Sequence, residues 1–439
     1  MIRSFQNIFR IQDLRKKILF TLLLLLLYRL GGHIPLPGIN TFALAKFFQA
    51  QKMGILGLFD IFAGGNLSRA TIFALGIMPY ITASIIFQLL AAVIPALQKL
   101  QKEGEEGRKK ITQYTRYATV ALAAFQSFGI AIFLQSQSIE GIRMVTAPGL
   151  MFIISTMLTL TAGTVFVMWL GERITEVGIG NGISLLIMVG IIARYPIEFG
   201  QTIAMLQSGV LSIFTVILIM LFMVLITASV VMITQGQRRI PVQYAKRVVG
   251  RKIYGGQSTH LPLNVNSAGV IPIIFAQSIM MFPQTIAQFF QGNATTSTIL
   301  ATITAWFQPG QLLYIVFYVG LIVFFAYFYT SVVINPNDLA DNMKKYGGFI
   351  PGHRPGKKTA EYIDYVISRI TLPGAIFFAF IAVLPMILIN RFSLPFYFGG
   401  TSLLIVVGVI LDTMRQIEAQ LMMRHYDGFL TKGKLRGRR

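Results

Sequence analysis

Several residue types that build common catalytic sites are missing from this sequence or scarce in it. The 439 residues include no cysteine, which excludes disulfide frameworks, thiolate zinc sites, iron–sulfur clusters and cysteine nucleophiles. Only four histidines remain as possible metal ligands. No HExxH or GxSxG motif is present, and no predicted membrane span holds paired carboxylates. The sequence therefore argues against an intramembrane protease or hydrolase, and it predicts no enzyme activity, no metal and no cofactor.

Charge is scarce as well, and negative charge especially. Charged residues make up 12% of the chain against 54% hydrophobic residues, and 16 acidic residues face 38 basic ones, giving a net charge of +22. A water-facing surface normally needs about 25% charged residues. Together with a mean hydropathy of +0.67, these values indicate that most of the chain lies in lipid.

Long apolar runs divide the chain into ten predicted membrane spans. Lipid offers the backbone no hydrogen bonds, so each crossing requires a helix of about 20 mainly apolar residues. The predicted fold class is therefore an all-α polytopic membrane protein. The ten spans cover residues 18–37, 70–94, 117–134, 149–170, 182–196, 209–234, 267–290, 311–334, 370–389 and 398–417.

The distribution of Lys and Arg predicts the orientation of the chain. Of the 38 basic residues, 31 lie in the termini and in alternate connections on one side, and seven lie on the other. The positive-inside rule places both termini in the cytoplasm, which requires an even number of spans. We therefore expect a multi-pass protein of the plasma (inner) membrane.

A short apolar stretch lies between the first two spans. Residues 56–63 are too short to cross a membrane, contain Asp60, and end at Gly64-Gly65-Asn66 before Arg69. This pattern favours a half-helix that folds back into the protein, which lipid tolerates only where protein or a water-filled cavity surrounds it. An amphipathic helix on the outer surface is the alternative.

The spacing of the spans suggests two related halves. The fifth and tenth spans are both short and preceded by glycines. If residues 1–200 and 201–439 each contribute five spans, the odd number inverts the second half relative to the first, as in many transport proteins. Coincidence is the alternative, because the halves show no obvious sequence similarity.

Two long connections on the basic side predict a docking surface. They cover about residues 235–266 and 335–368 and are rich in Gly, Pro, Lys and Arg. Their length suggests projecting hairpins that a large partner grips. Tyr244, Tyr254 and His260 stand among the basic residues of the first connection, which would also suit contact with RNA.

The span interiors hold almost no ionisable residues. Proton- and ion-coupled pumps need such residues inside the membrane. The residues alone thus predict a non-enzymatic channel or transporter with a re-entrant element and a cytoplasmic docking face. A secondary solute transporter with inverted repeats remains an alternative, and a lipid flippase or scramblase is a weaker one.

Sequence blocks along nearly the whole chain resemble the SecY family, the central subunits of bacterial protein-conducting channels. The resemblance rests on residues 64–69 (GGNLSR), 74–81 (ALGIMPYI), 178–184 (GIGNGIS), 245–247 (AKR), 257–262 (QSTHLP), 266–272 (NSAGVIP), 348–355 (GFIPGHRP) and 401–406 (TSLLIV). These blocks occur in the family's order.

The resemblance implies two inverted five-helix halves around a central pore. An apolar ring would form the pore's waist and a re-entrant plug would close it. Branched apolar side chains suit such a ring because they dewet against ions and bind a passing chain weakly. The implied ring residues are Ile77, Ile81, Ile183, Ile187, Ile274 and Ile405, and the implied plug, about residues 56–69, includes Asp60, Ile61, Phe62, Gly64, Gly65, Asn66 and Arg69.

The resemblance also implies a lateral gate toward lipid and a docking site for the partner that drives transport. Thr82, Gln126, Gln277 and Ser278 are candidates for the gate's polar seam, and Pro283 is expected to break the seventh span. The docking candidates on the long loops are Arg247, Arg251, Lys252, Arg354 and Lys357.

The implied function is passage of unfolded secretory polypeptides across the membrane, with apolar segments released sideways into lipid. The implied partners are the SecE and SecG subunits, the SecA motor ATPase or a ribosome, signal-bearing polypeptides and membrane lipid. DNA is not among them.

Overall fold

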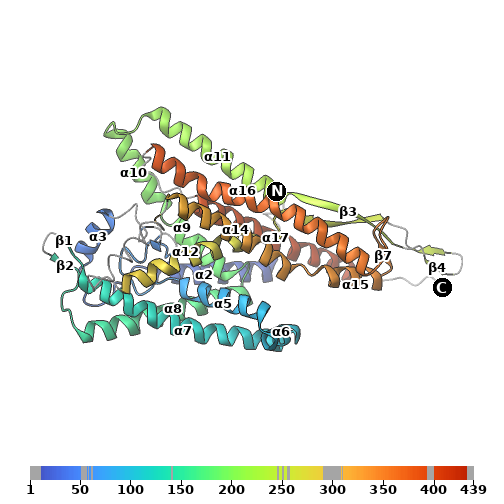
Figure 1. Ribbon diagram of the computed structural model, residues 1–439, viewed down its shortest axis with the longest axis horizontal. Coiled ribbons are helices and arrows are strands. Elements are labelled where there is room, and N and C mark those ends of the chain that lie inside the picture. The colour runs from blue at the N-terminus through green and yellow to red at the C-terminus, as the bar shows by residue number, and fades with distance from the viewer. Residues whose placement is uncertain are drawn as a thin grey trace. The chain divides into compact units, whose positions relative to one another are not determined.

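The structure is a computed structural model in which helices dominate and the described strands form small antiparallel sheets (Figure 1). It describes the whole chain except residues 1–10, 51–56, 58, 61–62, 140–141, 245–246, 250–251, 255–257, 290–307, 309, 393–399 and 433–439. The chain forms two compact units. The first unit comprises Met1–Ala204, Ser278–Pro309 and Val409–Arg439, and the second comprises Met205–Gln277 and Gly310–Gly408.

In the first unit, helix α8 packs against α2, α5, α7 and α9. Glycines allow this close packing: a Cβ on Gly163 of α8 would overlap the carbonyl oxygen of Ile72, and one on Gly182 of α9 would overlap that of Gly171 on α8. The helices are α2 (Gln12–Gly31), α3 (Thr41–Ala50), α5 (Met78–Val93), α6 (Pro95–Lys102), α7 (Glu105–Ser136), α8 (Leu150–Val177), α9 (Gly182–Ile192) and α10 (Tyr195–Gln207), with strands β1 (Ser138–Ile139) and β2 (Ile142–Arg143).

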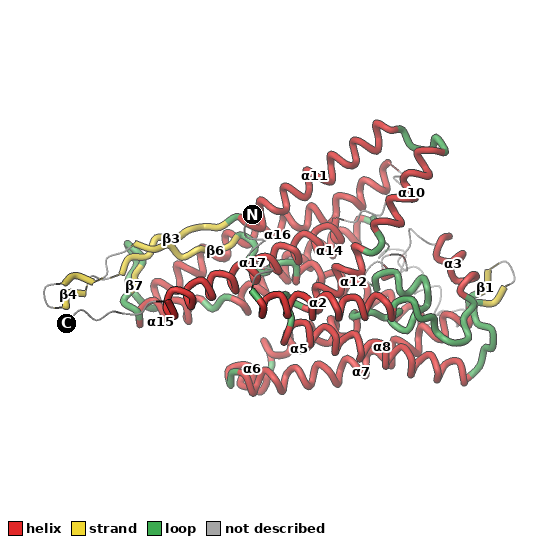
Figure 2. The backbone as a smooth tube through the Cα atoms, turned by 180° about the vertical axis from the view of Figure 1, so that it is seen from behind, coloured by secondary structure: helices red, strands yellow, loops and turns green. Residues whose placement is uncertain are grey.

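The second unit combines apolar helices with a three-stranded antiparallel sheet of order β6-β3-β7, whose strands are labelled and drawn in yellow in Figure 2. Ile240 of β3 pairs with Leu261 of β6 and Gln243 with Phe349 of β7. The elements are α11 (Ile213–Gln235), β3 (Gln237–Tyr244), β4 (Arg247–Val249), β5 (Lys252–Tyr254), β6 (Ser258–Asn264), α14 (Leu312–Val333), α15 (Pro336–Lys345), β7 (Gly348–Phe349) and α16 (Lys357–Phe392). The helices α12 (Ile271–Phe289) and α17 (Gly400–Lys432) cross the boundary between the units, as does the end of α10.

Among the described residues, seven helices are long and apolar enough to cross a membrane. The number rises to eight if α5 and α6, which are bent by 100° at their junction, form one span. A helix also lies at the other two predicted positions, but α2 carries four basic residues and the apolar part of α12 is short. The structure therefore supports a polytopic helical membrane protein, and the count of ten stays a prediction.

The second predicted span begins later than the sequence suggested. Residues 70–77 form turns, and helix α5 starts only at Met78. Gly76 has a positive φ of 56°, which ends any regular helix before it, and Pro79 occupies the first turn of α5, where its missing N–H costs nothing.

Helix α11 shows the surface expected of a lipid-facing span. Only 11% of its most apolar 18-residue stretch is buried inside the protein. Phe214, Leu218 and Leu225 are among its exposed side chains. Such a large exposed apolar face is rare on water-soluble proteins. This exposure agrees with burial in a bilayer rather than in water.

Candidate plug and pore-ring site

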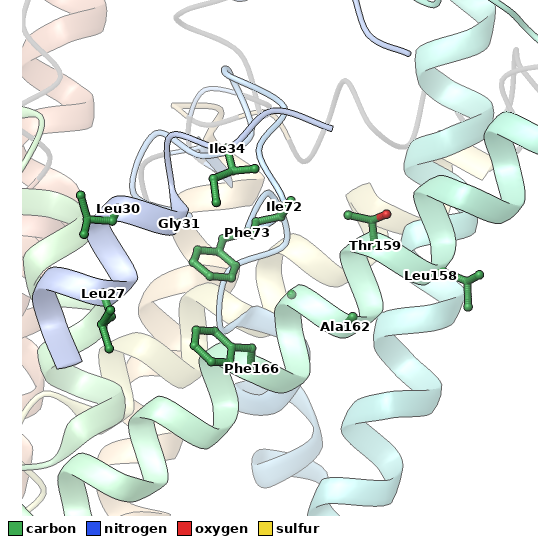
Figure 3. A pocket seen from close by; sticks show the side chains of 11 residues that line it. Leu27, Leu30, Gly31, Ile34, Ile72, Phe73, Leu158, Thr159, Ala162 and Phe166 are labelled. Carbon is green, nitrogen blue, oxygen red and sulfur yellow. The ribbon is translucent and has the colours of Figure 1, made fainter. Parts of the chain in front are cut away.

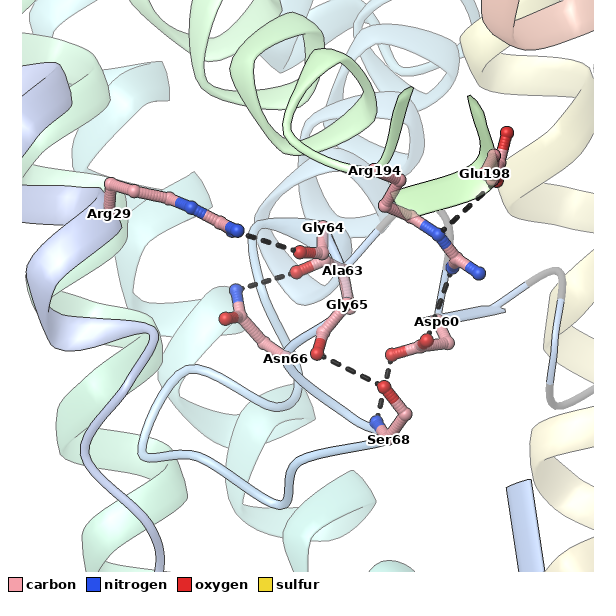
Figure 4. Close-up of polar contacts among 9 residues, drawn as sticks. All are labelled: Arg29, Asp60, Ala63, Gly64, Gly65, Asn66, Ser68, Arg194 and Glu198. Atoms are coloured by element: carbon pink, nitrogen blue, oxygen red, sulfur yellow. Dashed lines mark hydrogen bonds and ion pairs between the residues drawn. The ribbon is translucent and has the colours of Figure 1, made fainter. Parts of the chain in front are cut away.

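The plug segment, residues 56–69, contains a tight turn that packs into the first unit (Figure 4). Gly64 and Gly65 have φ values of 72° and 79°, which glycine adopts without strain. The Gly65 N–H donates to the carbonyl of Asp60 at 2.8 Å, and the side-chain amide of Asn66 donates to the carbonyl of Ala63 at 2.6 Å. Ile61 and Phe62 lie outside the described residues.

A buried ion pair fastens this segment to the end of α9. The Asp60 side chain is 5% exposed and receives a hydrogen bond of 3.1 Å from Nη1 of Arg194. Its other oxygen accepts the N–H of Ser68 at 2.8 Å. Nε of Arg194 lies 3.7 Å from Glu198 on α10. Because a buried carboxylate without a partner is strongly unfavourable, this pair fixes where Asp60 can lie.

Two further contacts hold the turn. A Cβ on Gly64 would lie 2.8 Å from Cα of Gly190 on α9, so the two backbones touch directly. Asn66, 2% exposed, donates to the hydroxyl of Tyr28 on α2 at 3.3 Å, and Nη1 of Arg29 reaches the carbonyl of Gly64 at 3.4 Å. The plug segment is therefore packed and hydrogen-bonded, not merely a glycine hinge.

Aromatic stacking anchors the chain just after the plug segment. The ring of Phe73 stacks on Tyr28 of α2 at 5.8 Å and on Phe166 of α8 at 5.9 Å. Phe73 also lines an apolar groove of about 770 Å³ between α2 and α8 (Figure 3). Among the described residues that line this groove, only Thr159 has a polar side chain.

The four ring candidates of the first unit lie on α5, on α9 and just before α5. Ile77, Ile81 and Ile187 are buried, and Ile183 is half-buried. Ile77 and Ile183 meet at Gly171 of α8, where an added Cβ would lie 3.5 Å and 3.2 Å from their side chains. The structure thus brings these two predicted residues together.

The start of α9 is held in place by side chains from three other elements. The Asn181 side chain caps α9 by accepting the N–H groups of Ile183 and Ser184. Backbone N–H groups of the preceding loop donate to Thr21 of α2 and Gln416 of α17, at 3.1 and 3.0 Å, and the N–H of Gly182 donates to Thr175 of α8 at 2.9 Å. Rigid support of this kind fixes where Ile183 points.

In the second unit, Ile274 and Ile405 are both buried, on α12 and α17. The start of α12 lies close to α17, since a Cβ on Gly408 of α17 would lie 2.7 Å from the side chain of Val270, one residue before α12.

Three of the gate candidates are buried. Gln126, Gln277 and Ser278 are at most 5% exposed, and neither amide atom of Gln277 has a hydrogen-bond partner among the described residues. Thr82 donates to the carbonyl of Met78 in its own helix. Helix α12 continues through Pro283, where we expected a break. Helices accommodate an internal proline by bending, because only one backbone hydrogen bond is lost.

The docking candidates lie in the connection between β3 and β6 and at the start of α16. Arg354 and Lys357 are exposed, and the Arg354 carbonyl accepts the hydroxyl of Thr359 at 2.9 Å. The neighbouring His353 ring stacks on Tyr362 at 4.0 Å. Arg247 and Lys252 belong to the paired strands β4 and β5, and Arg251 lies outside the described residues.

Sequence reasoning missed the residues that hold the plug segment, above all Arg194, Gly190 and Tyr28. Arg194 is one of the seven basic residues on the poorly basic side of the chain. The available signal was the position of Arg194. It is a basic residue directly after a short apolar helix, on the side where the sequence predicts few basic residues. Gly190 and Tyr28 gave none, because both residue types are common in apolar helices.

Residues 71–414 match the SecY family. A curated relative, the protein translocase subunit SecY of Escherichia coli strain K12, is 50% identical over 426 residues, which cover 97% of this chain and 96% of the relative. The chain belongs to the SecY family. The resemblance carried by its sequence blocks is thereby confirmed.

Solved SecY-type channels share the fold. A structure titled as showing that the SecY plug domain stabilises the closed translocation channel and maintains a membrane seal matches with a TM-score of 0.64 at 17% identity, over 92% of this chain and 91% of that one. Sec61 from a canine ribosome–channel complex matches with a TM-score of 0.58 at 17% identity, over 92% and 91%. At such low identity these likenesses establish the SecY architecture alone.

Proposed function

We propose that this SecY-family chain is the pore-forming subunit of a protein translocase and that unfolded secretory polypeptides pass through it. The match to the SecY family over nearly the full length of the chain carries this proposal. The relative from Escherichia coli, which is 50% identical, is a protein translocase subunit. The chain is not an enzyme in this account. Among the described residues no group of His, Asp and Glu could hold a metal ion.

The apolar ring and the plug segment together would close the pore at rest. Six isoleucines form the proposed ring, and in the first unit their support comes from the packing of α5, α8 and α9 around Gly171. Branched apolar groups repel ions by dewetting and grip no particular sequence. The Asp60–Arg194 pair and the hydrogen bonds of Asn66 support a plug that stays seated without substrate.

A lateral gate would release apolar segments into lipid. Its proposed polar seam consists of Thr82, Gln126, Gln277 and Ser278, with Pro283 about one and a half turns further along α12. The buried, unpartnered amide of Gln277 supports this role, because such a group favours any state that offers it a hydrogen bond. Hydrogen bonds between membrane helices contribute about 1 kcal/mol each, weak enough for an apolar signal sequence to replace.

The long basic loops would receive the partner that drives transport. Arg247, Arg251, Lys252, Arg354 and Lys357 are the proposed contacts, since guanidinium groups suit both the carboxylates of a motor protein and the phosphates of a ribosome. The exposure of Arg354 and the contacts that order its loop support this assignment. SecE, SecG and SecA are the partners that the family resemblance implies.

The topology completes the proposal. Ten spans in two inverted halves, residues 1–200 and 201–439, would surround the pore. Both termini would lie on the cytoplasmic side of a bacterial inner membrane. The charge distribution of the loops supports this orientation.

Reconstitution into sealed vesicles tests this function against its alternatives. We expect a signal-bearing precursor to become protected from protease only when SecE and the motor ATPase with ATP are present. A secondary solute transporter would instead accumulate a small solute, and a scramblase would move labelled lipid. Lipid or solute movement without any precursor protection would contradict the proposal.

A further inference from the structure

We propose that a small cavity in the second unit binds one ordered water molecule, which joins the turn before α12 to α14 and α16. The cavity is lined by residues 265–269, by the start of α12, by one face of α14 and by one face of α16. All of these segments belong to the same compact unit. A water site here would exist whether or not the chain conducts polypeptides.

The size of the cavity matches a single water molecule. Its volume is about 10 Å³. A buried water needs about 10–15 Å³ of such space. The cavity therefore accepts one water but is too small for a lipid chain or a hydrated ion.

The lining of the cavity is polar, whereas cavities that stay empty in proteins are lined by apolar side chains. Asn266 and Ser267 of the turn, Thr330 of α14 and Thr371 of α16 all contribute to it. A buried water typically makes about three hydrogen bonds to polar groups that would otherwise lack partners. Three separate segments offer such groups here.

The hydroxyl of Thr330 is the group that most needs a partner. Thr330 is 3% exposed, and its Oγ1 has no hydrogen-bond partner among the described residues. Other buried threonines bond within their own helix. The hydroxyl of Thr119 donates to the carbonyl of Thr115 at 2.7 Å, for example. Because an unpaired buried hydroxyl is unfavourable and Thr330 lines the cavity, a water bound there would stabilise the protein.

Oxygen atoms on the other two segments can accept hydrogen bonds from the same water. The Thr371 hydroxyl donates to the carbonyl of Ile367 at 2.9 Å, and its oxygen keeps the capacity to accept. The side-chain amide of Asn266 donates to the carbonyl of Gly269 at 3.1 Å, and its oxygen is likewise an acceptor. We expect the water to accept the proton of Thr330 and to donate its own two protons to Thr371 and Asn266.

The turn beside the cavity is already fixed to two other elements. A Cβ on Gly374 of α16 would lie 2.9 Å from the carbonyl oxygen of Val265, so the two backbones touch. The N–H of Val265 donates to the carbonyl of Gly236, at the end of α11, at 2.9 Å. Neither contact involves α14. The water would add a link to α14, and since α12 begins at Ile271, soon after this turn, it would help to fix where α12 starts.

An experimental density map of the full-length chain with SecE tests the site directly. At a resolution that shows ordered water elsewhere in the protein, we expect a peak about 2.7–3.0 Å from the Thr330 hydroxyl. The same peak should lie within hydrogen-bond distance of an oxygen on α16 or on the turn. A cavity without density, with the Thr330 hydroxyl turned to the carbonyl of Ala326 in its own helix, would overturn the proposal. A peak whose oxygen neighbours all lie at about 2.4 Å would also overturn it, because that distance indicates a metal ion.

Thermal unfolding in detergent provides a second readout. Thr330→Val keeps the shape of the side chain and removes only its hydroxyl. If the hydroxyl binds the water, the apparent Tm should fall by about 1–3 °C. An unchanged or raised Tm would show that the hydroxyl has no partner to lose, which would contradict the water site.

A double variant shows whether Thr330 and Thr371 share one water. Because Thr371→Val removes a second partner of the same water, the loss of Tm in the double variant should be smaller than the sum of the two single losses. Thr119→Val is the matched control, since Thr119 is fully buried and its hydroxyl bonds within α7. Its loss of Tm should add to that of Thr371→Val. Additive losses for Thr330→Val and Thr371→Val would overturn the shared site.

Discussion

At the scale of single residues, the proposed docking surface depends on a few exposed cations set in ordered loops. Two contacts order the backbone around Arg354. The ring of the preceding His353 stacks on Tyr362, and the hydroxyl of Thr359 donates a hydrogen bond to the Arg354 carbonyl. The loop therefore presents the guanidinium group from a defined backbone position. Because such a group is free of local salt bridges among the described residues, its charge is available to a partner.

Arg354→Glu should reduce motor-driven translocation about tenfold or more, since reversing a charge at an interface produces repulsion as well as loss of attraction. The rate of precursor protection in vesicles measures the effect. Lys358→Glu is the matched control, because the Lys358 side chain is 73% exposed and pairs with Glu361 of its own helix at 3.4 Å. A normal rate in Arg354→Glu with purified motor would contradict the docking assignment.

At the scale of helices, the site depends on close packing between α8 and α9. An added Cβ on Gly182 would overlap the carbonyl oxygen of Gly171, and the same Gly171 also lies against Ile77 and Ile183. One glycine thus brings together the helix pair and two proposed ring residues. Packing of backbone against backbone leaves no flexible atom to yield.

Gly182→Ala should destabilise the protein by about 1–3 kcal/mol, because α8 and α9 must separate to accept the methyl group. A thermal unfolding scan of the purified protein in detergent should show a lower apparent Tm. Gly200→Ala on α10, with open space around it, should leave the Tm unchanged. Equal Tm values for the two variants would show that the α8–α9 contact is not close-packed.

Removal of the plug turn tests the second closing element. Deletion of residues 61–66 eliminates Gly64 and Asn66, and with them the contacts to Gly190 and Tyr28, but leaves the Phe73 stack in place. We expect a channel that still translocates precursors and has a higher resting ion conductance in planar bilayers. Unchanged conductance would argue against the plug role.

Most helices could be predicted because lipid imposes one simple rule on them. A span such as α11 is apolar on all sides, and its position follows directly from hydropathy. The contacts that hold the plug segment in place could not be predicted in the same way. Asp60 and Arg194 are 134 positions apart, and nothing in their local sequence indicates that the fold brings them within 3.1 Å.

At the scale of the whole molecule, we propose that an apolar waist separates the aqueous solutions on the two sides of the membrane. This waist binds a passing polypeptide only weakly. The net charge of +22 does not conflict with this, because the basic residues concentrate in the loops and leave the spans almost free of charge. The proposed ring then determines how easily the resting channel opens.

The substitutions Ile274→Asn and Ile405→Asn should each favour the open channel and allow export of precursors with defective signals. Both isoleucines are buried, at 4% and 0% exposure, so an amide there lacks partners until the helices separate or water enters. Export of a signal-defective reporter in cells measures the effect. Strict signal dependence in both variants would count against a gating role for the ring.

The most direct test of the central claim is cross-linking between an arrested precursor and single cysteines in this cysteine-free chain. Cysteines replace Ile77, Ile187 or Ile405 in the proposed ring, and Leu218 on exposed α11 serves as the control. We predict that a precursor halted in mid-translocation cross-links to the three ring positions and not to Leu218. Cross-links at Leu218 with none in the ring would contradict the claim that polypeptides pass through this apolar waist.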